Sequence, residues 1–211
     1  MPRTKTRHVT SFTRPSSVTY SLGGPQATIT LPPHSSWTSG LHYHATHTEY
    51  LSVLQGVASI TLSGRSQDYT PGDGIIVVPR YARHEWHRAS HTGEDLIVRE
   101  WTDPEDGLKE SFFRNLNSVI NEPNPPLPCY SMFRGWWIEW QILVICNSMD
   151  NYPVFLDLAW LGFLGRMIED LIARVVLWAL VLAGGVFGLK GAYEEYAPVS
   201  MSVVKGRRKN A

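Results

Sequence analysis

The sequence predicts a mainly β protein with a helical, apolar extension at its C-terminal end. Short strand-like segments separated by Gly/Pro turns are evenly spaced over residues 17–99, and no helical pattern interrupts them. Helical spacing begins near residue 103, and a long apolar run covers residues 171–189. Regularly spaced short strands without intervening helices are typical of a β sandwich or barrel.

The composition narrows the class of protein. The 211 residues suffice for one ordinary domain plus an appendage. Hydrophobic residues make up 43% of the chain and charged residues 18%, so we expect it to fold. Basic and acidic residues number 19 each, and this zero net charge argues against nucleic acid as a partner. Two cysteines, Cys129 and Cys146, do not make a disulfide framework, so a reducing compartment is expected.

Residues 1–16 are predicted to be a disordered basic tail. No acidic residue precedes Glu49, whereas the basic residues before it are Arg3, Lys5, Arg7 and Arg14. An acid-free start rich in Arg, Ser and Thr also resembles an organelle transit peptide. However, Pro2 and Pro15 disfavour the amphipathic helix that such a peptide needs.

The predicted barrel covers residues 17–102. Its first two strands, SVTYSL and ATITL, alternate apolar and polar residues around a GGPQ turn. Two further strands flank Gly56 in YLSVLQGVASITLSG, and a Pro-Gly-Asp-Gly turn divides QDYTPGDGIIVVP. The segments RHEWHRA and EDLIVREW supply the last two strands.

The chain changes character after the barrel. Residues 103–128 are predicted to form a helix and a Pro-rich linker, because the apolar residues of the first part have helical spacing at Leu108, Phe112, Leu116 and Val119. Residues 129–189 are predicted to be an apolar helical region, and residues 190–211 a basic tail.

The run over residues 171–189 is a candidate transmembrane helix. It contains a single charged residue, Arg174. At a rise of about 1.5 Å per residue, a helix of this length reaches roughly 28 Å, close to the thickness of a hydrocarbon core. We therefore predict a single-pass, membrane-associated protein with membrane contact through residues 171–189. A helix buried against the β domain is the alternative, and the protein would then be cytoplasmic.

Two groups of histidines suggest a metal site. His42 and His44 are two residues apart, so on a strand they share one face. Glu49 can join them if the polar segment ATHT forms a turn or bulge, and His84 follows a turn farther along the chain. Three imidazoles and one carboxylate suit a divalent transition metal and leave coordination positions open for a substrate.

These residues carry a resemblance to a known family. The order Gly40, His42-x-His44, four residues, Glu49, six residues, Gly56 resembles the first cupin motif, and PGDGIIVVPRYARH resembles the second. The resemblance implies a single jelly-roll barrel with His42, His44, Glu49 and His84 as metal ligands. It also implies a similarity to small fungal cupin proteins encoded beside polyketide synthases, which are commonly labelled oxidoreductases. Two positions depart from the second motif: Tyr81 replaces a usual Gly, and Arg88 a frequent Asn.

Other residues are assigned by the same strand alternation. Tyr81 could narrow the mouth of the barrel, and Trp86 shares the face of His84, so these two are the candidate substrate-binding residues. Barrel core is the commoner role for such a tryptophan. His47 is interpreted as a turn residue exposed to water, and no catalytic residue is assigned. His34, His87 and His91 are interpreted as loop or surface residues, and Tyr43 as an outward-facing packing residue.

The function predicted from this resemblance is that of a metal-dependent oxidoreductase in secondary metabolism. The metal would be Fe(II), with Zn or Mn as alternatives, and the partner a small molecule, a polyketide intermediate. A metal-dependent isomerase or dehydratase is the second reading. The third is a non-catalytic, small-molecule-binding cupin anchored by its apolar tail. A homodimer is a further expectation, because a short barrel leaves an edge strand exposed.

Overall fold

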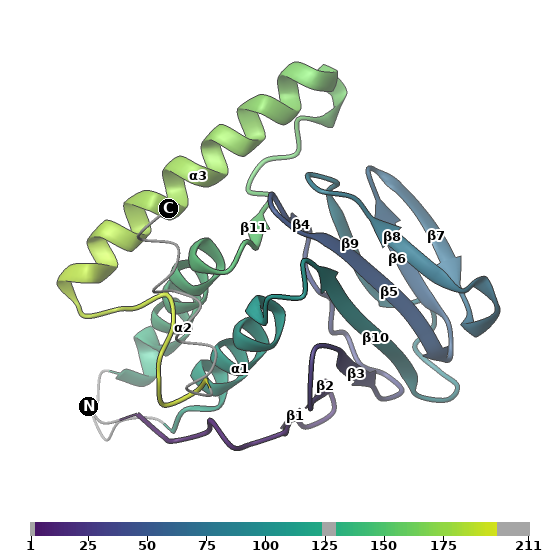
Figure 1. Cartoon of the computed structure of the whole chain (residues 1–211), viewed down its shortest axis with the longest axis horizontal. Helices are drawn as coiled ribbons and strands as arrows, with labels where there is room; N and C mark the ends of the chain where they lie inside the picture. Colours follow the sequence, from purple (N-terminus) through teal and green to yellow (C-terminus); the bar gives the residue numbers. More distant parts are fainter. Residues whose placement is uncertain (1–2, 124–129, 198–211) are drawn as a thin grey trace.

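Two β sheets face one another, and three helices gather at one end of them (Figure 1). The computed structural model describes residues 3–123 and 130–197. One sheet has six strands in the order β1 (Ser11–Arg14), β2 (Val18–Leu22), β3 (Ala27–Leu31), β10 (Leu96–Asp103), β5 (Thr48–Gln55) and β8 (Ile75–Val78). The other has five strands in the order β11 (Tyr152–Pro153), β4 (His42–Tyr43), β9 (His84–Arg88), β6 (Ala58–Leu62) and β7 (Arg65–Tyr69).

Alternating side chains build the core between the sheets. In β2 and β3 every second residue is buried, beginning with Val18 and Ala27, and β10 buries Leu96 and Val98 in the same way. Paired strands are antiparallel throughout the described sheets. Because one face of each strand is buried, the alternation fixes the register. The prediction of a mainly β domain followed by helices is confirmed.

The helices cover the open end of the β domain. They are α1 (Leu108–Asn121), α2 (Tyr130–Ser148) and α3 (Gly162–Val186), with short 3₁₀ turns η1 (Pro71–Asp73) and η2 (Ala159–Leu161). After α2, the chain returns to the β domain, where β11 pairs with β4 through Tyr152–Tyr43 and Pro153–His42. This pairing ties the helical layer to the strand that carries His42 and that His44 directly follows.

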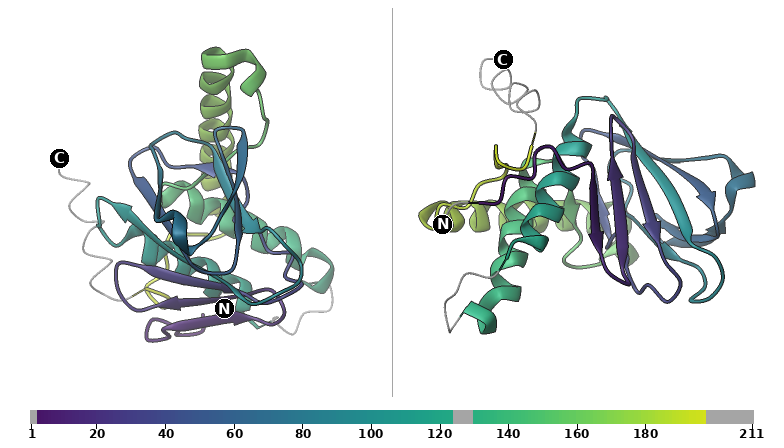
Figure 2. Two further views of the ribbon diagram at one scale, coloured as in Figure 1. Left: turned by 90° about the vertical axis from the view of Figure 1, so that its right-hand side faces the viewer. Right: turned by 90° about the horizontal axis from the view of Figure 1, so that it is seen from below.

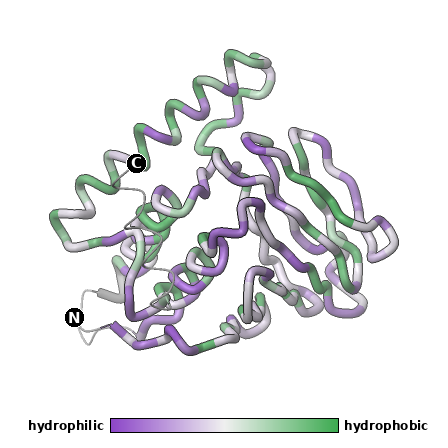
Figure 3. The backbone as a smooth tube through the Cα atoms, viewed as in Figure 1, coloured by the Kyte–Doolittle hydropathy of each residue, from purple (hydrophilic) through white to green (hydrophobic). Residues whose placement is uncertain are grey.

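The prediction of a membrane-spanning helix over residues 171–189, and of a single-pass membrane protein, is wrong. None of the helices in the described parts of the chain is both long and apolar enough to cross a bilayer. The helix ends at Val186, and extending the apolar run toward its beginning brings in Glu169 and Asp170. Figure 3 shows hydrophilic residues between the hydrophobic ones along α3.

The N-terminal segment is ordered, contrary to the prediction of a disordered tail over residues 1–16. Residues 11–14 form β1, and Phe12 is buried in the core. The Arg3 guanidinium lies 3.6 Å from the ring centre of Tyr193 and donates a hydrogen bond of 2.8 Å to the Tyr196 hydroxyl. Arg3 thus binds the N-terminal segment to the C-terminal region of the described chain.

Some of the predicted segments fall outside the described residues. They are residues 1–2, residues 124–128 of the Pro-rich linker and residues 198–211 of the basic tail. The described part of that tail includes the buried Tyr193 and Tyr196, which pack with Val119 of α1.

Candidate metal centre

The four predicted ligands meet between the two sheets. His42 on β4 lies directly opposite His84 on β9, and Glu49 reaches the same place from β5 in the facing sheet. His44 follows β4 by one residue. One ligand atom from each of the four side chains lies within 4.8 Å of the others, and all four residues are buried.

Each imidazole is held by a backbone carbonyl. The Nδ1 atom of His42 lies 2.7 Å from the Gly40 oxygen, that of His44 lies 2.6 Å from the Asp150 oxygen, and that of His84 lies 3.0 Å from the Ala82 oxygen. A carbonyl only accepts hydrogen bonds, so each Nδ1–H donates. The Nε2 atoms are then left as ligands, which is the usual arrangement around a protein-bound metal.

Unsatisfied polar atoms mark the centre of this cluster. His84 Nε2 and Glu49 Oε1 are buried without a hydrogen-bond partner and lie 3.6 Å apart. Buried polar groups rarely go unpaired, because the loss of hydration is costly. In addition, His44 Nε2 lies 2.7 Å from Glu49 Oε2. Two acceptor atoms this close require a cation between them, either a proton or a metal ion.

The ionisation states of the cluster suit a divalent cation. Burial, together with the neighbouring His84 and His44, holds the pKa of His42 well below its usual value, so its imidazole is neutral. Burial alone would raise the pKa of Glu49, but Lys109 and His84 hold it well below its usual value. Neutral imidazoles and an ionised carboxylate are the ligand forms that divalent transition metals bind. The four residues therefore could hold such a metal.

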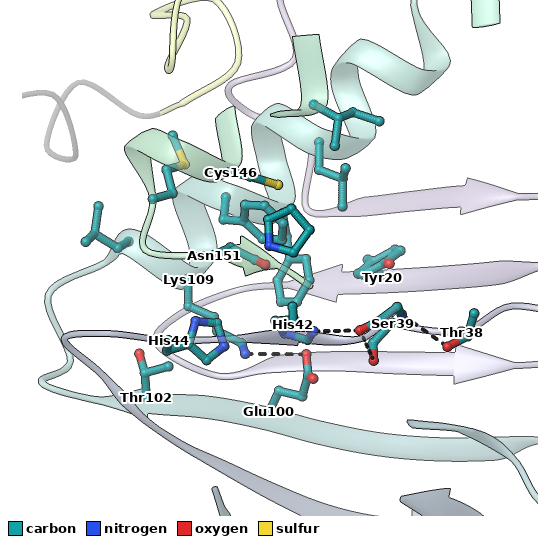
Figure 4. A pocket seen from close by; sticks show the side chains of 18 of the residues that line it. Tyr20, Thr38, Ser39, His42, His44, Glu100, Thr102, Lys109, Cys146 and Asn151 are labelled. Atoms are coloured by element: carbon teal, nitrogen blue, oxygen red, sulfur yellow. Dashed lines mark hydrogen bonds and ion pairs between the residues drawn. The ribbon is translucent and has the colours of Figure 1, made fainter. Parts of the chain in front are cut away.

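A buried lysine and a second glutamate adjoin the cluster. Lys109, at the start of α1, donates a 2.6 Å hydrogen bond to Glu49 Oε2, and its Nζ lies 3.7 Å from Glu100 Oε2. Figure 4 shows the Lys109 amine turned toward Glu100 beside His42 and His44. Trp86 Nε1 donates a 3.0 Å hydrogen bond to Glu100 Oε1.

This second glutamate differs from the first in its ionisation. Burial raises the pKa of Glu100 to about 7, although Lys109 partly opposes the shift. Burial would lower the pKa of Lys109, but Glu100 and Glu49 together keep it above its usual value. The site therefore combines a permanent cation with a carboxyl group that can hold a proton near neutral pH.

An apolar cavity of about 340 Å³ opens onto these groups. His42, His44, Glu100 and Lys109 form its polar end. The remaining wall is mainly apolar and comes from the barrel, from α1 and α2 and from the turn after α2. It includes Tyr20, Trp37, Phe112, Phe113, Leu116, Ile142, Leu143 and Met149. A largely apolar pocket with a few convergent polar groups is the usual form of a small-molecule site.

His47 is buried, contrary to its interpretation as a water-exposed turn residue. Its Nδ1 lies 2.6 Å from Asp150 Oδ2, and its Nε2 lies 3.4 Å from Asp106 Oδ1. Asp150 also accepts hydrogen bonds from the amides of Ala45 and Thr46. The turn that brings Glu49 toward the histidines is therefore held by a residue from the turn between α2 and β11.

Tyr81 and Trp86, the predicted substrate-binding residues, do not line the cavity. Tyr81 is half-exposed outside the barrel, where its ring stacks on Tyr43. Trp86 is fully buried in the core against Trp37. Its indole contacts Glu100 through a hydrogen bond from the core side and does not reach the cavity. Tyr43 does face away from the barrel interior, as predicted, but it is covered by α3, to which its hydroxyl donates a 2.6 Å hydrogen bond at Asp170.

Two residues of the site, Glu100 and Lys109, were not predicted from the sequence. Glu100 could have been found, because it shares the inward face of β10 with Leu96 and Val98, and a carboxylate at such a position is unusual. Lys109 has no comparable signal in the sequence. Its approach to Glu49 depends on how α1 docks against the open end of the barrel.

Comparisons with known proteins show what the β domain is similar to. Residues 27–99 match the family model described as "Cupin domain". The chain is 29% identical over 161 residues to "Probable oxidoreductase virH" of Hypocrea virens, covering 74% of this chain and 66% of that protein. It is 35% identical over 100 residues to "Oxidoreductase iacF" of Pestalotiopsis fici, covering 45% of each. The match thus spans less than two thirds of the length of either relative.

Solved structures resemble only part of the chain. KdgF from Halomonas sp. is 17% identical with a TM-score of 0.34, covering 42% of this chain and 82% of that one. The capsular polysaccharide assembling protein CapF from Staphylococcus aureus is 18% identical with a TM-score of 0.35, covering 44% of this chain and 27% of that one.

Proposed function

We propose that the protein is a metal-dependent oxidoreductase of the cupin type that acts on a small, largely apolar molecule; residues 27–99 match the cupin domain model. One observation carries the proposal: four buried ligand residues converge, and two of them, His42 and His44, line the polar end of an apolar cavity. The two fungal relatives named as oxidoreductases support the same reaction class.

The proposed metal is Fe(II), with Mn(II) and Zn(II) as alternatives. Three imidazoles fixed through Nδ1 and one carboxylate match the ligand preference of all three ions. When bound, a divalent ion with these ligands supplies a redox-active or Lewis-acidic centre with open coordination positions. With Fe(II), dioxygen would be the electron acceptor of the reaction.

The residues around the metal position would bind and orient the substrate. Phe112 and Phe113 of α1, with Ile142 and Leu143 of α2, would exclude water from the cavity and hold a carbon skeleton against the polar end. There the ammonium group of Lys109 can stabilise a negative charge on a substrate oxygen. The Oε2 atom of Glu100, which has no hydrogen-bond partner, could accept a proton from the substrate or return one to it.

We propose a polyketide intermediate of secondary metabolism as the substrate. The mainly apolar wall fits an oxygen-bearing carbon skeleton without a large charge, and the volume of about 340 Å³ limits its size. The fungal origin of the two relatives is compatible with such a pathway.

A metal-dependent isomerase or dehydratase is the second candidate. Glu100 and Lys109 favour it, because a carboxyl group and an ammonium group beside the metal position are the groups that proton abstraction next to a carbonyl requires. Neither reaction type changes the ligand set.

Turnover under defined gas and metal conditions tests the proposal. The protein is stripped with a chelator, reloaded with Fe(II), Mn(II) or Zn(II), and incubated with aromatic polyketide alcohols and aldehydes. Oxygen uptake and product mass are both recorded. We expect the Fe(II) protein to consume oxygen in a substrate-dependent manner and His84→Ala to lose this activity. His87→Ala should retain it, because His87 is an exposed histidine on the same strand.

Other outcomes of this experiment reject the proposal in different ways. Turnover of equal rate without oxygen, supported by Zn(II), would identify the isomerase or dehydratase. Equal substrate binding by the wild type and by His84→Ala, with no turnover by the wild type under any of these conditions, would identify a non-catalytic binding protein.

A further inference from the structure

The outer face of α3 carries a continuous row of exposed apolar side chains. We call this row the α3 stripe; it consists of Phe163, Met167, Leu171, Val175, Trp178, Leu182 and Val186. Each of these side chains is between 54% and 83% exposed. They are spaced by three or four residues, so they share one side of the helix along its whole length. In Figure 2, α3 stands at the outside of the molecule.

The opposite face of α3 is already occupied. Gly165, Ala173, Leu177 and Gly184 are buried. Trp140 of α2 donates a 2.9 Å hydrogen bond from Nε1 to the Leu180 oxygen. Arg83, from the loop before β9, binds Glu169 at 2.8 Å. These contacts fix the rotation of α3 about its axis. The side chains of the α3 stripe therefore stay exposed to solvent in the single chain.

The size of the α3 stripe is that of a protein interface. At these exposures, seven large apolar side chains present on the order of 800 Å². Monomeric soluble proteins rarely expose a contiguous apolar patch above a few hundred Å². A stable protein–protein interface buries about 800 Å² on each partner. The stripe therefore matches one side of such an interface.

Its charge pattern indicates what kind of surface covers it. The stripe contains no charged residue, and the acidic residues near it are paired, Asp170 with Arg174 at 2.8 Å and Glu169 with Arg83. A helix that lies in a lipid surface carries Lys and Arg on the face opposite its apolar row. In α3 the opposite face is instead packed onto the rest of the chain. The matching surface is an uncharged apolar row of similar length.

We propose that two copies of this chain associate through their α3 stripes. A second copy supplies an uncharged row of the same length. An antiparallel arrangement about a two-fold axis brings the Phe163 end of one stripe to the Val186 end of the other. Rows of side chains spaced by three and four residues interdigitate in such helix pairs. The interface would lie on α3 and leave the edge strand β8 free.

The oligomeric state of substituted proteins tests the proposal. We expect the wild-type protein to sediment as a dimer at micromolar concentration in velocity ultracentrifugation. Leu171→Glu with Trp178→Glu should weaken the dimer at least a hundredfold and give a monomer at the same concentration. The matched control is Ile75→Glu with Val77→Glu, which places the same charges on the exposed apolar face of β8. Circular dichroism and metal content should be unchanged in both variants, because all four positions are exposed.

Three results overturn the proposal. The first is a wild-type monomer at every concentration, and the second is a dimer that the β8 variant breaks and the α3 variant does not. The third is flotation of the wild-type monomer, but not of the α3 variant, with vesicles of phosphatidylcholine and phosphatidylserine. That result would assign the stripe to a lipid surface.

Discussion

The charges nearest the candidate metal centre come from three residues that the fold buries together. Glu49, Glu100 and Lys109 are each less than one-tenth exposed, and a single ammonium group faces both carboxyl groups. Taking charges out of water is costly unless each has a partner. A metal ion bound to Glu49 would also compensate the negative charge of this carboxylate. The ammonium group of Lys109 could then interact with a substrate.

This sharing predicts how loss of the lysine affects stability. Lys109→Met leaves Glu49 without its cation, so in the presence of chelator we expect the free energy of unfolding to fall by about 3 kcal/mol. Adding Glu100→Gln to this variant should restore part of the loss, because one buried carboxyl group becomes neutral. Urea denaturation measures both values, and Lys190→Met, at an exposed lysine, serves as the control. An equal loss in Lys109→Met and Lys190→Met would contradict the interpretation.

Individual residues of the site were predictable to different degrees. His42, His44, Glu49 and His84 could be predicted because their residue types and spacing suffice to suggest a common ligand set. Their convergence in the structure agrees with that expectation. Lys109 could not be predicted, because its role depends on the docking of a helix whose sequence pattern shows only its apolar face. The burial of His47 was missed because its partner, Asp150, lies more than a hundred residues later in the chain.

At the scale of elements, the turn between α2 and β11 connects the helices to the metal ligands. Asp150 lies in this turn. Its backbone oxygen accepts the hydrogen bond of His44, and its carboxylate receives His47 and the amides of Ala45 and Thr46. The geometry of the predicted ligands is thus set partly from outside the β domain.

The pKa shifts of Asp150 and of its partner His47 predict that the free energy of unfolding depends on pH. Burial opposes ionisation of Asp150, but hydrogen bonds from His47 and Thr46 lower its pKa from 3.8 to about 2. The resulting stabilisation is present above pH 3.8 and is lost as the pH falls toward 2. The hydrogen bond to Asp150 raises the pKa of His47 above 6.5, so its stabilisation is present below pH 6.5 and is lost at higher pH.

Asp150→Asn isolates this effect. Between about pH 4 and pH 6.5 we expect the variant to be less stable than the wild type by about 2 kcal/mol. The difference should shrink toward pH 2, where the wild-type carboxylate becomes protonated. Chemical denaturation at pH 5.5 and pH 3 measures the two values, and a difference of the same size at both would show that the charge of Asp150 is not responsible.

At the scale of the whole molecule, the β domain and the helices that follow it were predictable, and the way in which the helices pack was not. Strand alternation and turn residues indicated the barrel, because one face of each strand must enter the core. The apolar run of residues 171–189 suggested a membrane helix, but its neighbouring charges and the end of α3 at Val186 exclude a span. Long-range contacts such as Arg3–Tyr193 and Tyr43–Asp170 arrange the helices, and local patterns do not reveal such contacts.

This arrangement links the proposed dimer to the site. Tyr43 lies between His42 and His44 in the sequence, and Asp170 of α3 holds its hydroxyl. A second copy packed on the α3 stripe would therefore steady the helix that covers the back of β4. The cavity itself is closed by α1 and α2, so each copy retains a complete site.

Metal stoichiometry tests the central claim most directly. The wild-type protein and variants at single ligand positions are loaded anaerobically with Fe(II), desalted and analysed by inductively coupled plasma mass spectrometry. We predict about one metal ion per wild-type chain and per His87→Ala chain, and less than about a tenth of that in His42→Ala and His84→Ala. Full metal content in the ligand variants, or none in the wild type, would contradict the assignment of this cluster as a metal centre.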